Sequence, residues 1–260
     1  MVSGLVRPIG LLAVVMAAVV GLAVPLAPMP DAGAAGTRYD VSNWTDPSGH
    51  THRVRWNPCQ TITFAVNPKL AGRSAAARAS AVEDVQQAFR RVGKRVGIDF
   101  AYAGRTDEIP RNGASQSWSS RQKAAEVVVA WVDQDRAATR SNLIGKSGGR
   151  YPSGVGGWMM RYSADQYQAA IGRGFVVLNA DHNRRYARGF GSGTTRGALL
   201  LHEIGHVMGL GHVGTTRELM YPTMLDRGSS NYKRGDRTGL AKVGRSLGCI
   251  KGANDFWPQI

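Results

Sequence analysis

The chain has 260 residues, of which 43% are hydrophobic and 20% are charged. That balance is ordinary for a globular protein, and it excludes a disordered chain, a collagen-like repeat and a small disulfide-rich scaffold. Lysine and arginine outnumber aspartate and glutamate by 33 to 18, so the formal net charge is +15.

The first 34 residues are typical of a secretory signal peptide. Arg7 supplies a positive start, an apolar run extends over residues 9–24, and Ala32-Gly33-Ala34 forms a small-residue cleavage site. We therefore expect cleavage after Ala34 and a secreted, extracellular protein. The alternative is an uncleaved signal anchor, because the apolar run is long for a signal peptide.

Residues 56–260 are predicted to form one domain, preceded by an irregular lead-in at residues 35–55. Alternating or continuous apolar runs predict four strands, at residues 61–66, 98–102, 127–132 and 175–178. Apolar residues spaced by three and four predict three helices, at about residues 74–96, 195–208 and 235–247. Residues 141–157 contain six glycines and predict a mobile surface loop. This order favours an α/β or α+β domain with a largely parallel sheet.

The segment from His202 to His212 follows the pattern H-E-x-x-H-x-x-G-x-x-H. On a helix, His202 and His206 lie one turn apart on one face, so both imidazoles can bind one metal ion. Gly209 can turn the chain back and bring His212 to the same metal. Three histidines leave one coordination position open, as in catalytic zinc sites, and the carboxylate of Glu203 lies free beside them. The alternative is a buried helix whose histidines are satisfied by hydrogen bonds.

On this motif the sequence resembles the metzincin metallopeptidases, and most closely the matrixins. The resemblance implies a twisted, mostly parallel five-stranded sheet with one antiparallel edge strand, an active-site helix and a C-terminal helix. It also implies a secreted zinc endopeptidase with polypeptide substrates. His202, His206 and His212 would hold one catalytic zinc ion, and Glu203 would act as the general base that activates the zinc-bound water.

The resemblance extends to a turn and to a substrate-binding edge. Met220 would be the structural methionine of a tight turn beneath the zinc, and Tyr221 and Pro222 after it are candidates for the substrate pocket. The antiparallel edge strand, expected at about residues 157–161, would bind an extended substrate by added-strand pairing. Gly157 and Trp158 therefore complete the set of candidate pocket residues.

The second, structural zinc of matrixins and their calcium ions bind in the loop between the middle strands. Residues 141–157 contain no His, Asp or Glu, so the sequence supports one zinc ion and no calcium. Cys59 and Cys249 are expected to form a disulfide, because an exported chain meets an oxidising environment. The alternative is a pair of unbonded, buried thiols.

The positive charge allows a competing function. A basic secreted protein can be an adhesion module for anionic cell-wall polymers, with a vestigial or secondary metal site. The sequence contains no nucleic-acid-binding motif, so no specific nucleic-acid partner is expected. We expect a monomer, and anionic cell-surface polymers stay open as partners beside the polypeptide substrates.

Overall fold

The computed structural model describes residues 38–111, 125–146 and 148–258. The expected signal peptide and its cleavage site lie outside the described residues. The strands are β1 (Asn43–Thr45), β2 (Thr51–Arg53), β3 (Ile62–Asn67), β4 (Phe100–Arg105), β5 (Val127–Val132), β6 (Gly154–Tyr162), β7 (Ala169–Asn179) and β8 (Trp257–Pro258). The α-helices are α1 (Ala75–Val96), α3 (Ala180–Asn183), α4 (Arg196–Val207) and α5 (Arg234–Ala241). In the described ranges, no helix is both long and apolar enough to cross a membrane.

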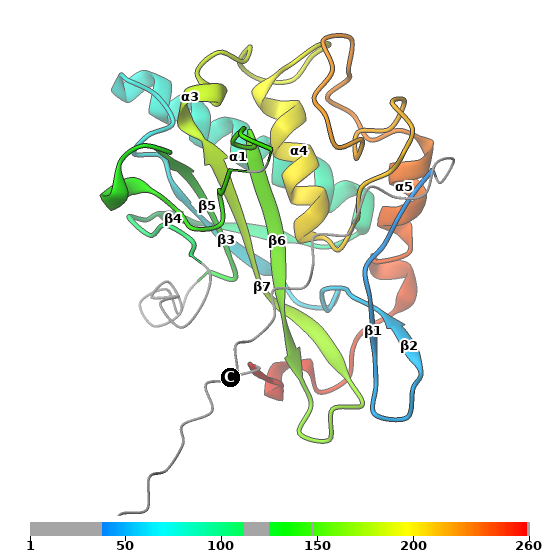
Figure 1. Ribbon diagram of the computed structural model, residues 1–260. Helices are drawn as coiled ribbons and strands as arrows, with labels where there is room; N and C mark the ends of the chain where they lie inside the picture. Colours follow the sequence, from blue (N-terminus) through cyan, green and yellow to red (C-terminus); the bar gives the residue numbers. More distant parts are fainter. Residues whose placement is uncertain (1–37, 112–124, 147, 259–260) are drawn as a thin grey trace, which may run out of the picture.

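The main sheet has the strand order β4-β3-β5-β7-β6-β8 (Figure 1). β3 is parallel to β4 and β5, β5 is parallel to β7, and β6 is antiparallel to β7. The expected α+β fold, with a mostly parallel five-stranded sheet and one antiparallel strand, is therefore confirmed. The two-residue strand β8 extends this sheet, because it pairs with Arg161 and Tyr162 of β6.

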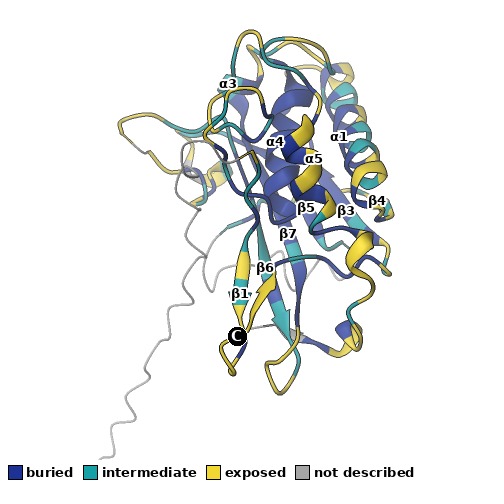
Figure 2. Cartoon of the chain, turned by 90° about the vertical axis from the view of Figure 1, so that its right-hand side faces the viewer, coloured by how far each residue is buried: buried dark blue, intermediate teal, exposed yellow. Residues whose placement is uncertain are grey.

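Both faces of β5 are covered, which explains its continuous apolar sequence. Val127, Val129 and Trp131 belong to the main core, which also contains the buried residues of α1 and α4. Val128 and Val132 belong to a smaller cluster with Ile144 from the following loop. α4 is buried along its whole length between α1 and the strands β6 and β7 (Figure 2).

The long helix α1 matches the predicted range because both of its ends carry clear signals. The side chain of Ser74 accepts a hydrogen bond from the amide of Ala77, which caps the first turn. Gly97 ends the helix in the left-handed conformation, with φ of 69°. The C-terminal helix α5 is shorter than predicted and ends at Ala241. The chain continues as a 3-10 turn at Arg245–Leu247 after Gly244, a residue type that disfavours helix.

The lead-in is not irregular, which corrects the prediction for residues 35–55. β1 and β2 form an antiparallel hairpin, and Val41 makes a β-bridge with Leu210 just after α4. The turn of the hairpin is held by Asp46, whose carboxylate accepts hydrogen bonds from the amides of Ser48 and His50. Each strand has only three residues, and they are mostly exposed, so no apolar alternation marks them in the sequence.

The predicted loop at residues 141–157 is also wrong at its C-terminal end. The connection between β5 and β6 covers residues 133–153, and Gly154, Gly156 and Gly157 are part of β6. Glycine is rare inside strands unless another group comes close to the backbone. The position of α4 supplies that reason, because a Cβ at Gly154 or Gly156 would clash with Glu203 of this helix.

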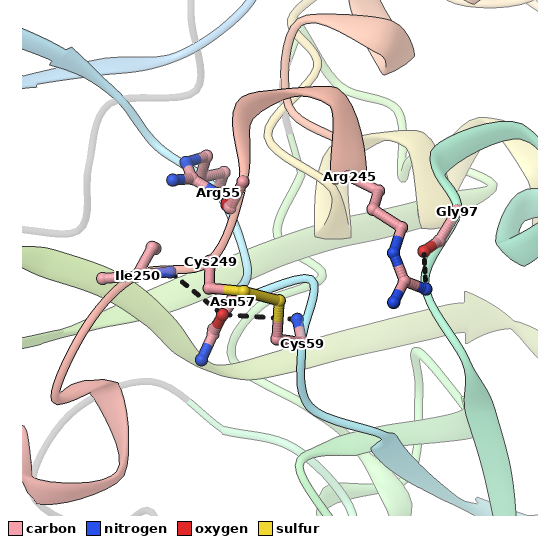
Figure 3. Close-up of a disulfide and its surroundings, with 8 residues drawn as sticks. Arg55, Asn57, Cys59, Gly97, Arg245, Cys249 and Ile250 are labelled. Atoms are coloured by element: carbon pink, nitrogen blue, oxygen red, sulfur yellow. Dashed lines mark hydrogen bonds between the residues drawn. A yellow bond between two sulfur atoms is a disulfide. The ribbon is translucent and has the colours of Figure 1, made fainter.

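Cys59 and Cys249 form the expected disulfide, with their Cα atoms 5.4 Å apart. The amide of Asn57 lies beside the bridge, and its oxygen accepts hydrogen bonds from the backbone of Cys59 and Ile250 (Figure 3). The two cysteines are 190 residues apart in the sequence. The bridge therefore ties the segment before β3 to the segment after α5.

Candidate metal centre

Helix α4 and the turn that follows it bring three imidazoles together. The Nε2 atom of His206 lies 3.3 Å from that of His202 and 3.1 Å from that of His212, and the third Nε2–Nε2 distance is 3.3 Å. Gly209 permits the chain reversal, because its φ of 91° is a conformation that other residues rarely adopt. The three side chains predicted from the sequence therefore converge on one point.

The lead-in also holds this turn in place, and sequence reasoning missed its contribution. The amide of Ser42 donates to the carbonyl of Gly209, and the amide of Gly211 donates to the carbonyl of Asp40. The Asp40 carboxylate lies so close to Gly211 that a Cβ there would come within 2.0 Å of it. The position of His212 therefore depends on a turn that Asp40 and Ser42, from a distant part of the chain, hold by hydrogen bonds.

Backbone carbonyls fix the orientation of two of the rings. Nδ1 of His202 lies 2.8 Å from the carbonyl oxygen of Leu219, and Nδ1 of His206 lies 2.8 Å from that of Leu210. A carbonyl only accepts, so Nδ1 carries the proton in both rings and Nε2 carries a lone pair. Those lone pairs point at one another, and a cation between them would remove their mutual repulsion.

Burial keeps these rings neutral. It lowers the pKa of His202 to about 4, and it lowers the pKa of His206 well below its ordinary value. The pKa of His212 is also lowered by burial, although the nearby Asp40 carboxylate opposes that shift. Neutral imidazole is the form that binds metal, so all three rings are suited to the role at neutral pH.

The geometry fits a zinc ion. With Zn–N distances of about 2.0–2.1 Å, two ligands of a tetrahedron lie roughly 3.3 Å apart. The observed Nε2–Nε2 distances of 3.1–3.3 Å match that spacing. His202, His206 and His212 would hold the ion, and one of the four tetrahedral positions would be left for another ligand.

Glu203 belongs to α4, and its side chain lies against β6. Burial raises the pKa of its carboxyl group to about 8, and a hydrogen bond from the Gly156 backbone opposes the shift. A Cβ at Gly154 would lie 2.7 Å from the Glu203 carboxylate, and a Cβ at Gly156 would lie 2.0 Å from the Glu203 carbonyl oxygen. The spacing G-x-G puts both glycines on one face of a strand, but nothing in the sequence shows that Glu203 approaches that face.

Met220 lies directly against α4, beside Gly205. Its sulfur would be 2.4 Å from a Cβ at Gly205, so glycine is needed there for close packing. The buried carboxylate of Asp236 accepts hydrogen bonds from the amides of Leu219 and Met220 and fixes the turn. Burial raises the pKa of Asp236 to about 6, despite these hydrogen bonds.

The four candidate pocket residues do not gather in one place. Tyr221 lines a hollow of about 750 Å³ beside α4, whereas Pro222 is exposed and Gly157 and Trp158 are absent from its walls. Gly157 faces the other side of the sheet, because a Cβ there would meet the ring of Phe175. Gly154 and Gly156 lie on the opposite face of β6, against Glu203 of α4. The role of the four candidate residues in binding substrate stays a prediction.

The remaining histidines lie outside this cluster. Nε2 of His52 is 2.9 Å from the Asp46 carboxylate, which together with backbone hydrogen bonds lowers the pKa of Asp46 to about 2. His50 lies on the same hairpin turn. His182 is in α3, where its Nδ1 is 3.2 Å from the hydroxyl of Ser153.

A second group of metal-ligating side chains consists of Asp133, Asp135 and Asp181. One carboxylate oxygen from each lies within 4.8 Å of the others. Arg136 pairs with Asp133 and Arg184 pairs with Asp181, so two of the three carboxylates already have cationic partners. Asp133 and Asp135 belong to the loop between β5 and β6, which begins earlier than the predicted range.

The family assignment comes from a match to a family model. The family model described as matrixin matches residues 114–243, half of the chain. Matrilysin of Felis catus is 37% identical over 90 residues, which cover 34% of this chain and 32% of matrilysin, so the chain spans about a third of that relative's length. The crystal structure of metalloproteinase-II from Bacteroides fragilis matches 74% of this chain and 57% of that one, with 16% identity and a TM-score of 0.39.

Proposed function

This chain belongs to the matrixin family, whose members are zinc-dependent endopeptidases, and on that premise we propose that it is a secreted enzyme that hydrolyses peptide bonds. The observation that carries the proposal is the convergence of three neutral Nε2 atoms at 3.1–3.3 Å. The N-terminal segment, with its signal-peptide pattern, supports export of the chain.

When bound, zinc supplies Lewis acidity that activates a water molecule and polarises the scissile carbonyl group. Glu203 is the general base in this proposal. Its carboxylate takes a proton from the attacking water and passes the proton to the departing amine. The backbone of Gly156 donates a hydrogen bond to Glu203, which orients the carboxylate.

The free edge of β6 is suited to binding a polypeptide. In the described part of the chain, one edge of β6 pairs with β7 along its length, and the other pairs with β8 only at Arg161 and Tyr162. The backbone groups of residues 154–160 on that second edge can pair with an extended substrate. This stretch includes the two glycines beside Glu203, so the substrate backbone would pass the general base.

Two measurements test the proposal. The purified protein should contain one zinc ion per chain and should digest casein. 1,10-Phenanthroline should abolish digestion, and added zinc should restore it.

Glu203→Gln should retain the zinc and lose activity by at least about 100-fold, the usual contribution of a positioned base. Chelator-resistant digestion, or full activity in Glu203→Gln, would refute the proposal.

A further inference from the structure

A hollow beside the histidines is lined by both cationic and apolar side chains, which the histidine motif does not explain. It opens between α4 and the segment at residues 215–234, and its volume is about 750 Å³. Ala198 in its wall lies one helical turn before His202. Leu219 in its wall accepts the hydrogen bond from the His202 ring. The hollow and the metal centre therefore share one helix and one turn.

The wall of this hollow is strongly positive. Five exposed cationic side chains line it: Arg38, Arg217, Arg227, Lys233 and Arg234. In the ranges that the structure describes, none of the five forms an ion pair with a carboxylate. Glu218 is the acidic residue among the lining residues, but it is buried and accepts a hydrogen bond from the amide of Asp236. The positive charge is therefore left available to a ligand.

The hollow also has apolar surface. Leu219, Tyr221, Met224 and Leu225 line it and are each partly exposed. A small inorganic anion would gain from the cations but nothing from these side chains. A glutamate side chain offers both a short apolar stem and a terminal carboxylate. The combination of surfaces therefore favours an acidic amino-acid side chain over a simple anion.

We propose that the basic hollow, lined by the five cations above, binds an acidic side chain of the polypeptide substrate close to the bond that is cleaved. This inference rests on the proposed peptidase function and adds a substrate class to it. Each exposed charge pair changes an equilibrium by roughly 1.5- to 5-fold, so two or three pairs together give about a tenfold preference. The preference should weaken as salt is raised, because exposed charges are screened.

A set of quenched fluorescent peptides tests this substrate class. The set places Glu, Gln, Leu or Lys in turn at each of four positions on either side of the scissile bond and is assayed with the zinc-loaded, full chain. At one position, kcat/KM for Glu should exceed that for Gln by about tenfold at low salt, and Lys should be the poorest. Failure to cleave any peptide would count against the peptidase function. Cleavage with no acidic preference would overturn only the present inference.

A charge-reversed variant provides the decisive comparison. Arg217→Glu combined with Arg227→Glu should lose the preference for Glu and cleave the Lys peptide faster than the parent does. A gain in rate cannot arise from misfolding. The matched control is Lys69→Glu combined with Arg90→Glu, which makes the same change of charge at exposed positions outside the hollow. The control should retain the parental preference.

Two results would overturn the assignment. One is an unchanged acidic preference in Arg217→Glu/Arg227→Glu. The other is a flat peptide profile in the parent together with binding of dextran sulfate that the same variant loses. The second result would show that the hollow binds an anionic polymer and not a substrate side chain.

Discussion

Two clusters each bring three metal-ligating groups together: the histidines of α4 and the turn after it, and the aspartates that follow β5 and β7. In the histidine cluster, backbone carbonyls hold two rings through Nδ1, and the Nε2 atoms face one another. His202 and His206 are buried, and His212 is half-buried. In the aspartate cluster, Arg136 and Arg184 already pair with two of the carboxylates, and Asp135 is exposed.

The difference shows that proximity of ligand atoms is not enough to make a metal site. A ligand is prepared for metal when a second partner orients it and when the ligand atom has no better partner than the metal. The histidines meet both conditions, since burial keeps them neutral and their lone pairs converge. The aspartates fail the second condition, because Arg136 and Arg184 already pair with the carboxylates of Asp133 and Asp181.

The largest effect is expected from His206→Ala. Loss of an outer-shell partner costs metal sites about 10- to 100-fold in affinity, so loss of a ligand should cost more than about 100-fold. Zinc content after dialysis against a weak chelator should fall to background, together with peptide cleavage. Tight zinc binding by this variant would show that the three histidines are not the zinc site.

A large effect on stability, without an effect on metal, is expected from Cys59→Ser combined with Cys249→Ser. The bridge closes a loop of 190 residues, for which the chain-entropy model gives about 5 kcal/mol. The melting temperature should fall, while zinc content and low-temperature turnover stay near those of the parent. Loss of zinc from the folded variant at low temperature would show that the histidine site depends on the bridge.

A smaller effect is expected from Gly156→Ala, which tests the contact between β6 and the helix of the histidines. The new methyl group would lie 2.0 Å from the Glu203 carbonyl oxygen, so β6 and α4 must separate. Overpacking of this kind costs about 1–3 kcal/mol. We expect a lower melting temperature and lower kcat with zinc retained.

The matched control for Gly156→Ala is Gly145→Ala, because an added Cβ at Gly145 meets no atom within 4 Å. That variant should behave like the parent. Equal behaviour of the two variants would mean that β6 does not position Glu203.

The smallest effect is expected from Asp133→Asn combined with Asp135→Asn. Surface substitutions of this kind usually change the free energy of unfolding by less than about 0.5 kcal/mol. Zinc content should stay the same, and added calcium should not shift the melting temperature of the parent or the variant. If calcium stabilised the parent but not the variant, the aspartate cluster would be a metal site after all.

The sequence was most informative where function depends on spacing along one helix. His202 and His206 are four residues apart, and a helix fixes their relation whatever surrounds it. The ranges of α1, α4 and β5 also followed from local pattern, because capping residues and apolar runs act over a few residues. The chemistry of the centre was therefore readable before the fold was known.

The sequence was least informative about contacts between segments that are far apart. Nothing local shows that Asp40 and Ser42 hold the turn at Gly209–His212, or that Gly154 and Gly156 make room for Glu203. The same glycines were mistaken for part of a loop, since glycine signals a turn unless a second element approaches the strand. The site's ligand types were predictable, but the groups that position them were not.

By itself, the sequence determined which residues could bind a metal, because a helical repeat and a glycine turn set that geometry locally. Only the tertiary structure decided that the Nε2 atoms meet at 3.1–3.3 Å. Folding also places the carbonyls of Leu210 and Leu219, which hold the Nδ1 atoms of His206 and His202. It also decided that five cations from residues 38–234 line one hollow. Charges scattered in a sequence become a surface only when packing brings them together.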